Sequence, residues 1–191
     1  MTRVGIYPGS FNPATTAHVA IADAARQQRR LDRVVLAHSP QVLGKADVER
    51  PLFQHRIQVL EAVAAEHDWL EALVTRHRLL SDIADGYDVL IMGADKWHQI
   101  QELTWYHNSE QERDEAMARL PELAIAPRPP LSVPDRWRLD LPEAAVGGVS
   151  STEARAGHLE LMAPAAHRFA EATGAWIDPD RYERWLRDHP A

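Results

Sequence analysis

A strand, a tight turn and a helix start follow one another within the first 18 residues, and this segment constrains the fold more than any other. Arg3 to Tyr7 is a β-branched and aromatic run that stops at Pro8-Gly9-Ser10, which predicts a buried strand ending in a turn. Thr15 or Thr16 can then cap the Ala-rich helix that follows. This order would gather free backbone N–H groups, hydroxyls and the His18 imidazole around one small volume, which suits a bound phosphate. A plain strand-to-helix turn with a threonine cap is the alternative.

Strand and helix patterns alternate along most of the remaining chain. The alternation predicts an α/β fold, a Rossmann-like parallel sheet with helices on both faces. Ligands bind such sheets beyond the carboxyl ends of the strands, so residues 8–18 and 93–97 should share one rim. Further strands are predicted at residues 33–37, 72–75, 89–92 and 123–126, and helices at 17–28, at 79–84 and over about 15 residues with Pro51 in the first position.

Composition excludes several classes of protein. The chain has 191 residues, of which 45% are hydrophobic and 26% charged, which fits one domain over residues 1–191 with a C-terminal helical portion from about residue 150. The absence of cysteine excludes thiol catalysis, Cys-ligated zinc and iron–sulfur clusters. The net charge of −7 argues against binding to nucleic acid or an anionic membrane, so a phosphate must be held locally. No signal peptide or membrane span is predicted, and we expect a cytoplasmic protein.

The segment from Gly9 to His18 resembles the first signature of the nucleotidyltransferase superfamily, G-[TS]-F-[DN]-P-x-[HT]-x-G-H. His18 falls on the second histidine of that signature and Thr15 on the position that is His or Thr, whereas Ala17 stands where the family has Gly. The resemblance implies catalytic roles for His18 and Thr15. It also implies an ATP-binding set made of Gly9, Ser10, Phe11 and His18.

A second segment, Val149 to Arg155, resembles the ISST-x-[IL]-R box of the same superfamily. Hydroxyls at a helix start and a planar guanidinium can grip a triphosphate. The alternative is an ordinary Ser/Thr N-cap with Glu153 in a capping-box role. The two boxes occur in the family's order near opposite ends of the chain, which favours the first interpretation. The residues implied to bind ATP here are Ser150, Ser151, Thr152 and Arg155.

A third segment, Val89 to Asp95, is a hydrophobic strand that ends in Gly-Ala-Asp. It resembles the strand and turn that hold adenine and ribose in nicotinate- and nicotinamide-mononucleotide adenylyltransferases, which implies ATP-binding roles for Gly93 and Asp95. Trp105 resembles the tryptophan that stacks on the pyridine ring in those enzymes. A tryptophan of the core or surface is the alternative for this residue.

Two basic residues complete the resemblance on the acceptor side. Lys45 resembles the mobile lysine of the family that contacts phosphate, and Arg56 resembles the arginine on the helix that follows. The resemblance thus implies acceptor binding by Lys45, Arg56 and Trp105, with a catalytic role for Lys45 as well.

The resemblance implies an adenylyltransferase of NAD biosynthesis that moves the adenylyl group of ATP to nicotinate or nicotinamide mononucleotide and releases pyrophosphate. Mg²⁺ would be carried by the nucleotide, with no separate metal site in the protein. One alternative keeps the chemistry but changes the acceptor to phosphopantetheine, a flavin, or a sugar or alcohol phosphate, with either ATP or CTP as the donor. Another is a nucleotide-binding sensor without turnover. Relatives often form oligomers, so a homo-oligomer is compatible with the resemblance.

The histidines and the C-terminal tail offer weaker signals. The six histidines at positions 38, 55, 67, 77, 98 and 107 show no metal-ligand spacing, and most are predicted to lie on the surface. The tail from Tyr182 to His189 is a candidate docking helix for a partner, although a helix that covers the protein's own core is favoured.

Overall fold

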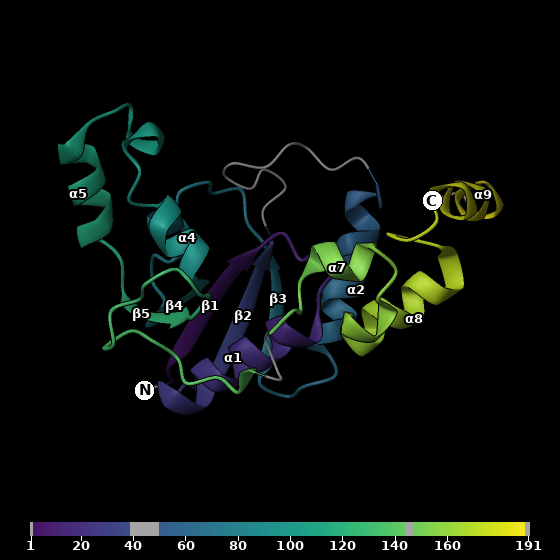
Figure 1. The fold of residues 1–191 in the computed structure, drawn as a ribbon, viewed down its shortest axis with the longest axis horizontal. Coiled ribbons are helices and arrows are strands. Elements are labelled where there is room, and N and C mark those ends of the chain that lie inside the picture. The colour runs from purple at the N-terminus through teal and green to yellow at the C-terminus, as the bar shows by residue number, and fades with distance from the viewer. Residues whose placement is uncertain (1, 39–49, 144–146, 190–191) are drawn as a thin grey trace.

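Five strands form one parallel sheet in the order β3-β2-β1-β4-β5, in a computed structural model that describes residues 2–38, 50–143 and 147–189 (Figure 1). Each strand expected from the sequence is present, with ends shifted by one or two residues. The strands are β1 (Val4–Gly9), β2 (Arg33–His38), β3 (Leu70–Val74), β4 (Val89–Gly93) and β5 (Glu122–Ala126).

Helices connect and flank these strands. The α-helices are α1 (Thr16–Gln28), α2 (Phe53–Ala64), α3 (Leu80–Ile83), α4 (Ala94–Gln99), α5 (Glu110–Ala118), α7 (Ser151–Arg155), α8 (Pro164–Thr173) and α9 (Pro179–Asp188). Short 3₁₀ helices are η1 (Leu103–Tyr106) and η2 (Leu159–Leu161).

The strands are buried on both faces because successive side chains point to opposite sides of the sheet. In β4, Val89 and Ile91 join the core on the side of α1, α2, α7 and α8, whereas Leu90 and Met92 join the core on the side of α3 and α4. In β2, Val34 and Leu36 join the first of these cores, and Val35 and Ala37 join the second. The predicted Rossmann-like sheet with helices on both faces is therefore confirmed.

The connections after β1 and β4 diverge to opposite faces. The chain leaves β1 into α1, whose Ala22 and Ala25 pack in one core, and leaves β4 into α4, whose Trp97 packs in the other. Neighbouring parallel strands whose connections diverge leave a crevice beyond their carboxyl ends. This switch point lies between Gly9 and Gly93, at the rim expected from the sequence.

One detail of the sequence prediction was wrong. Pro51 does not open a helix, because α2 begins at Phe53 with Leu52 as its N-cap. Of the six histidines, most of which were predicted to lie on the surface, two are exposed, two are half-buried, and His38 and His55 are buried. The start of α2 and the burial of these two histidines involve contacts from distant parts of the chain, which are described below.

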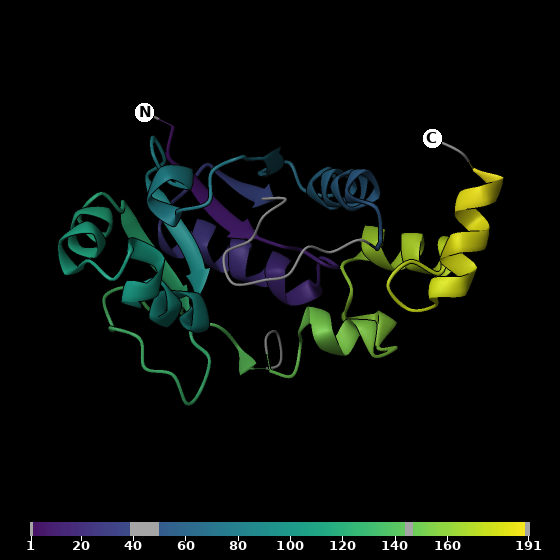
Figure 2. The same ribbon diagram turned by 90° about the horizontal axis from the view of Figure 1, so that it is seen from above.

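The tail helix covers the protein's own core, as the favoured prediction had it. Tyr182 of α9 is 2% exposed and packs against His55 of α2. α9 and α5 lie at opposite ends of the long axis of the molecule (Figures 1 and 2). Among the described residues, no helix has the length and apolar character needed to cross a bilayer.

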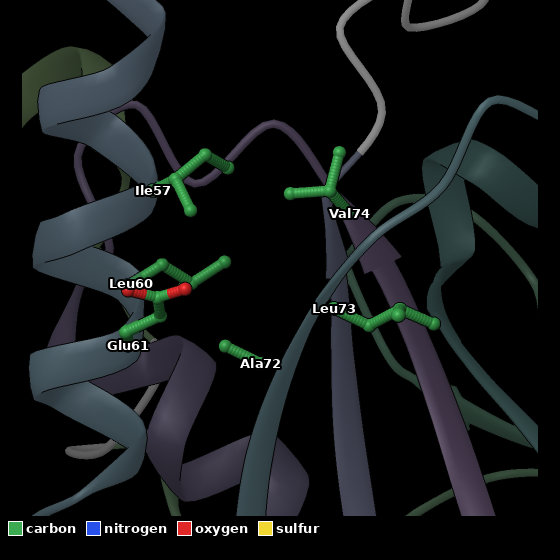
Figure 3. Close-up of a pocket in the computed structure, with 6 residues that line it drawn as sticks. All are labelled: Ile57, Leu60, Glu61, Ala72, Leu73 and Val74. Carbon is green, nitrogen blue, oxygen red and sulfur yellow. The ribbon is translucent and has the colours of Figure 1, made fainter.

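A shallow hollow lies between α2 and the edge strand β3 (Figure 3). Its walls are Ile57, Leu60 and Glu61 on one side and Ala72, Leu73 and Val74 on the other. None of the site residues implied by the family resemblance lines it, so the candidate site must be sought at the switch point.

Candidate functional site

The first turn of α1 is held by a reciprocal pair of contacts between Thr15 and His18. The Thr15 hydroxyl accepts from the His18 backbone N–H at 3.4 Å, and the Thr15 backbone N–H donates to His18 Nδ1 at 3.0 Å. Imidazole thus takes the place that Glu or Gln usually has in a capping box. His18 is therefore both a candidate site residue and a partner in the cap of α1.

This contact fixes the tautomer of the neutral His18 ring. A backbone N–H can only donate, so Nδ1 must offer its lone pair and the ring proton must lie on Nε2. The first turn of α1 carries no acidic residue, so the positive end of the helix dipole is not offset there. The arrangement offers an N–H donor beside a helix N-terminus, which suits an anion.

Three aromatic rings stand together at the end of β1. The Phe11 ring lies 5.1 Å from the His18 ring and 5.7 Å from the Tyr7 ring, centroid to centroid, with edge-to-face geometry in both pairs. Gly9 permits this packing, because a Cβ there would come within 2.8 Å of the Phe11 ring. Phe11 also has a φ of +39°, which is unusual for a side chain of this size. The turn is therefore shaped by close packing.

The β4 side of the crevice approaches the same aromatic group. Asp95 is exposed in the first turn of α4 and lies 3.8 Å from Arg128. Burial and then the Asp95 carboxylate raise the pKa of Tyr7, while Arg128 opposes the shift. Gly93 lets the Asp95 carboxylate approach the backbone, because a Cβ at that position would lie 2.5 Å from Asp95 Oδ1 in its present position. The ends of β1 and β4 thus face one another through Tyr7 and Asp95.

The two signature segments, far apart in the sequence, are hydrogen-bonded to one another. The Arg155 guanidinium donates to the carbonyl of Asn12, and the Ser151 hydroxyl donates to the carbonyl of Pro13 at 2.9 Å. Figure 1 shows the resulting position of α7 beside the turn between β1 and α1. His18 is half-buried and Arg155 is exposed, so neither is sealed inside the core.

The hydroxyls of the second box all have partners within the protein. Ser150 is the N-cap of α7 and accepts from the Glu153 N–H at 3.1 Å, as the alternative interpretation of this box expected. The Ser151 hydroxyl donates to the Pro13 carbonyl in the turn after β1, and Thr152 Oγ1 accepts from Arg155 at 3.2 Å. These bonds orient Arg155 against the first box, and a role for the hydroxyls toward ATP stays a prediction.

A buried basic group adjoins the other side of the turn. His38 ends β2 opposite Gly9 and is 1% exposed, with its ring 5.3 Å from that of Phe53. Burial and then the charge of Arg56 lower the pKa of His38 to about 4, partly opposed by hydrogen bonds to the backbone of Gly9 and Ser10. The Arg56 guanidinium lies 5.5 Å from the Phe53 ring. Arg56 is therefore close to the crevice, and His38 is neutral at pH 7.

The remaining predicted acceptor residues are not gathered into this group. Trp105 lies in η1 beyond α4, and its indole Nε1 is buried without a hydrogen-bond partner among the described residues. Within the described part of the chain, no ring contact or hydrogen bond joins Trp105 to the turn after β1. Lys45 falls outside the described residues. Both roles remain predictions.

Asn12 joins three segments of the site, although no role was predicted for it from the sequence. Its carbonyl accepts from Arg155, and its side-chain oxygen accepts from Trp176 Nε1 at 2.6 Å. Asn12 belongs to the first signature, so the motif itself was a signal for it. Nothing in the sequence singles out Trp176, whose partner lies 164 positions away.

With this geometry in place, comparison with known proteins identifies the family. The profile of the cytidylyltransferase-like family matches residues 6–157, which include both signature segments, four whole strands and β1 from Ile6 onward. The chain belongs to this family. α8 and α9 lie beyond the matched range.

Relatives within this family carry consistent names. A protein of Streptococcus pyogenes serotype M3 named probable nicotinate-nucleotide adenylyltransferase is 32% identical over 124 residues, covering 53% of this chain and 57% of its own. Proteins with the same name match from Streptococcus mutans, with the same identity and coverage, and from Bordetella pertussis, at 41% over 69 residues, or 35% and 34% of the two chains. The chain thus spans little more than half the length of the streptococcal relatives.

The buried state of His38 makes stability depend on pH. The unfolded chain binds a proton near the ordinary histidine pKa, whereas the folded protein does so only near pH 4, so stability is lost as pH falls between these values. We expect the free energy of unfolding to fall by about 2 kcal/mol more between pH 7 and pH 5 in the wild type than in His38→Asn. Urea unfolding at the two pH values measures this. The exposed His107→Asn variant is the control, and an equal pH response in His38→Asn would contradict the assignment.

Proposed function

We propose that the chain is a nucleotidyltransferase that moves the adenylyl group of ATP to the phosphate of nicotinate mononucleotide. The observation that carries the proposal is the direct hydrogen bonding of the two signature segments, which brings Arg155 to the turn that leads to His18. The names of the relatives support this choice of acceptor. Family membership supports the reaction class.

The reaction is an in-line displacement at the α-phosphorus of ATP. An oxygen of the acceptor phosphate forms a new P–O bond, and the bond to the bridging oxygen of the β-phosphate breaks, so pyrophosphate leaves. No covalent enzyme intermediate is needed. The protein positions both phosphates and stabilises the charge that spreads over their oxygens.

His18 is suited to that task by its tautomer. The Nε2–H set by the cap can donate to an α-phosphate oxygen, while the start of α1 supplies backbone N–H groups and a favourable dipole. Thr15 holds the ring in this state through its N–H and hydroxyl. Gly9, Ser10 and Phe11 would line the phosphate path, and Gly93 and Asp95 would meet the nucleoside from the β4 side.

The remaining roles divide between the two substrates. Arg155 would hold the β- and γ-phosphates, for which its planar fork is suited. Arg56 would hold the acceptor phosphate, with Lys45 as its second cation and Trp105 stacking on the pyridine ring. Mg²⁺ bound to the nucleotide would neutralise part of the phosphate charge. Within the described residues, no three His, Asp or Glu side chains gather as they would around a metal ion.

Pyrophosphate release with a panel of substrates tests the proposal. Each nucleoside triphosphate is combined with nicotinate and nicotinamide mononucleotide, phosphopantetheine, a flavin phosphate, and sugar and alcohol phosphates. We expect release with ATP and nicotinate mononucleotide. Release with another pair would assign a different acceptor or donor, and ATP binding without release for any acceptor would identify a sensor.

Removal of the His18 donor should slow the chemical step. We expect His18→Ala to lower turnover by about 10²–10³, the scale found when one preorganised oxyanion donor is lost. His18→Asn is the sharper variant, because its amide oxygen can still accept from the Thr15 N–H while the donor at Nε2 is gone. It should therefore keep the thermal stability of the wild type and lose turnover. Full turnover in a folded His18→Asn protein would refute the role.

Arg155 should act on nucleotide affinity. We expect Arg155→Ala to weaken ATP binding by roughly 1.5–3 kcal/mol, the range for a charge-assisted hydrogen bond. Calorimetric titration with ATP measures this, and Arg155→Lys should recover only part of the affinity because a lysine lacks the planar fork. Unchanged affinity in Arg155→Ala would count against the assignment.

A further inference from the structure

Residues 158–189 lie beyond the family match, yet they return to both halves of the candidate site. We call this segment the C-terminal arm. It contains η2, α8 and α9, and α8 packs along α2. Two of its aromatic side chains make polar contacts with the site-bearing segments, one on each side of the crevice.

Trp176 contacts the nucleotide side. Its indole N–H donates to Asn12 Oδ1 at 2.6 Å, and Asn12 is 9% exposed. An indole N–H can only donate, so the contact fixes which side of the Asn12 amide faces the arm. Asn12 is also the residue whose carbonyl receives Arg155. The orientation of one buried amide therefore joins Trp176 to the contact between the two signature segments.

The arm also holds the backbone of the same turn. The Ala163 N–H donates to the Ala14 carbonyl at 3.1 Å, and Met162 forms an antiparallel bridge with Thr15. Thr15 is the residue that caps α1 and bonds to His18. The turn from Asn12 to Thr15 is thus fixed by the arm through one side chain and two backbone positions.

Tyr182 contacts the acceptor side. Its hydroxyl accepts from the Leu52 N–H at 3.1 Å and is also hydrogen-bonded to His55 Nδ1 at 2.6 Å. Leu52 is the N-cap of α2 and has no side-chain capping bond of its own. Glu183 forms an ion pair with Arg50 just before this cap. A hydroxyl from α9 therefore supplies the cap that the sequence around Leu52 lacks.

The capped turn is the one that carries Arg56. The Arg56 N–H donates to the Leu52 carbonyl at 3.1 Å, so a shift of Leu52 moves the backbone of Arg56 directly. Burial lowers the pKa of Arg56, and Tyr182 lies close enough to oppose that shift. Arg56, which is 6% exposed, thus takes its backbone position from a turn whose first residue is held by Tyr182.

We infer that Trp176 and Tyr182 are positioning residues that set the two halves of the site separately, Trp176 the nucleotide half through Asn12 and Tyr182 the acceptor half through the first turn of α2. The identity of the two ligands rests on the proposed function. The contacts themselves do not, because they join parts of this chain to one another.

Two single substitutions test the inference, and each is the control for the other. Trp176→Phe removes the indole donor and Tyr182→Phe removes the hydroxyl, both from the same arm. We expect Trp176→Phe to raise the KM for ATP by about threefold to tenfold, the effect of one lost hydrogen bond, with little change in the KM for nicotinate mononucleotide. Tyr182→Phe should raise the KM for nicotinate mononucleotide by a similar factor, with little change in the KM for ATP. If both variants raise both constants in proportion to their loss of thermal stability, the arm is merely structural and the inference fails.

A double variant tests the route through Arg56. Arg56→Ala removes the side chain that Tyr182 is inferred to position, so adding Tyr182→Phe to it should raise the KM for the acceptor no further. A further rise of the same size as in the wild-type background would overturn the route.

Binding and spectroscopy separate this inference from the proposed function. If the wild type shows no turnover with nicotinate mononucleotide, the proposed acceptor is wrong, but ATP affinity and the NMR signal of the Arg56 Nε–H can still be measured. Trp176→Phe should then weaken ATP binding about threefold to tenfold and leave the Arg56 signal in place, whereas Tyr182→Phe should shift that signal and spare ATP binding. An unmoved Arg56 signal in Tyr182→Phe, or unchanged ATP affinity in Trp176→Phe, overturns the inference.

Discussion

The candidate site depends on the hydrogen bonds that join Asn12 and Pro13 to the second signature segment. A turn at the end of a parallel strand has no ladder partner of its own, so its carbonyl groups need donors from elsewhere. Here Arg155 and Ser151 supply them from the far end of the chain. The same bonds bring a guanidinium to the start of α1. The contact that satisfies the turn therefore also assembles the site.

This local construction explains how an acidic protein can hold phosphate. A net charge of −7 gives no long-range attraction for polyanions, so binding must come from groups aimed at one place. The start of α1 provides them with no acidic residue in its first turn, and Arg155 and Arg56 approach from two other elements. His38, beside Gly9, is neutral at pH 7 and therefore adds no positive charge to this region.

The sequence predicted those features that depend on local patterns. Strand boundaries followed from the hydrophobic runs, and the switch point followed from the order of strands and helices, because both are decided within short segments. The capping role of Ser150 was also visible as an alternative. By contrast, the burial of His38 and His55 and the displaced start of α2 depend on Phe53, Arg56 and Tyr182, which meet only in the folded protein. Contacts between residues so far apart in the chain cannot be predicted from the local patterns of one sequence.

The capping contact between Thr15 and His18 has one more consequence. The same side chain completes the helix start and faces the crevice, so loss of its hydrogen bond to the Thr15 backbone N–H would release the ring and the first turn of α1 together. Local order at the start of α1 and presentation of the imidazole are therefore two outcomes of one contact between neighbouring residues.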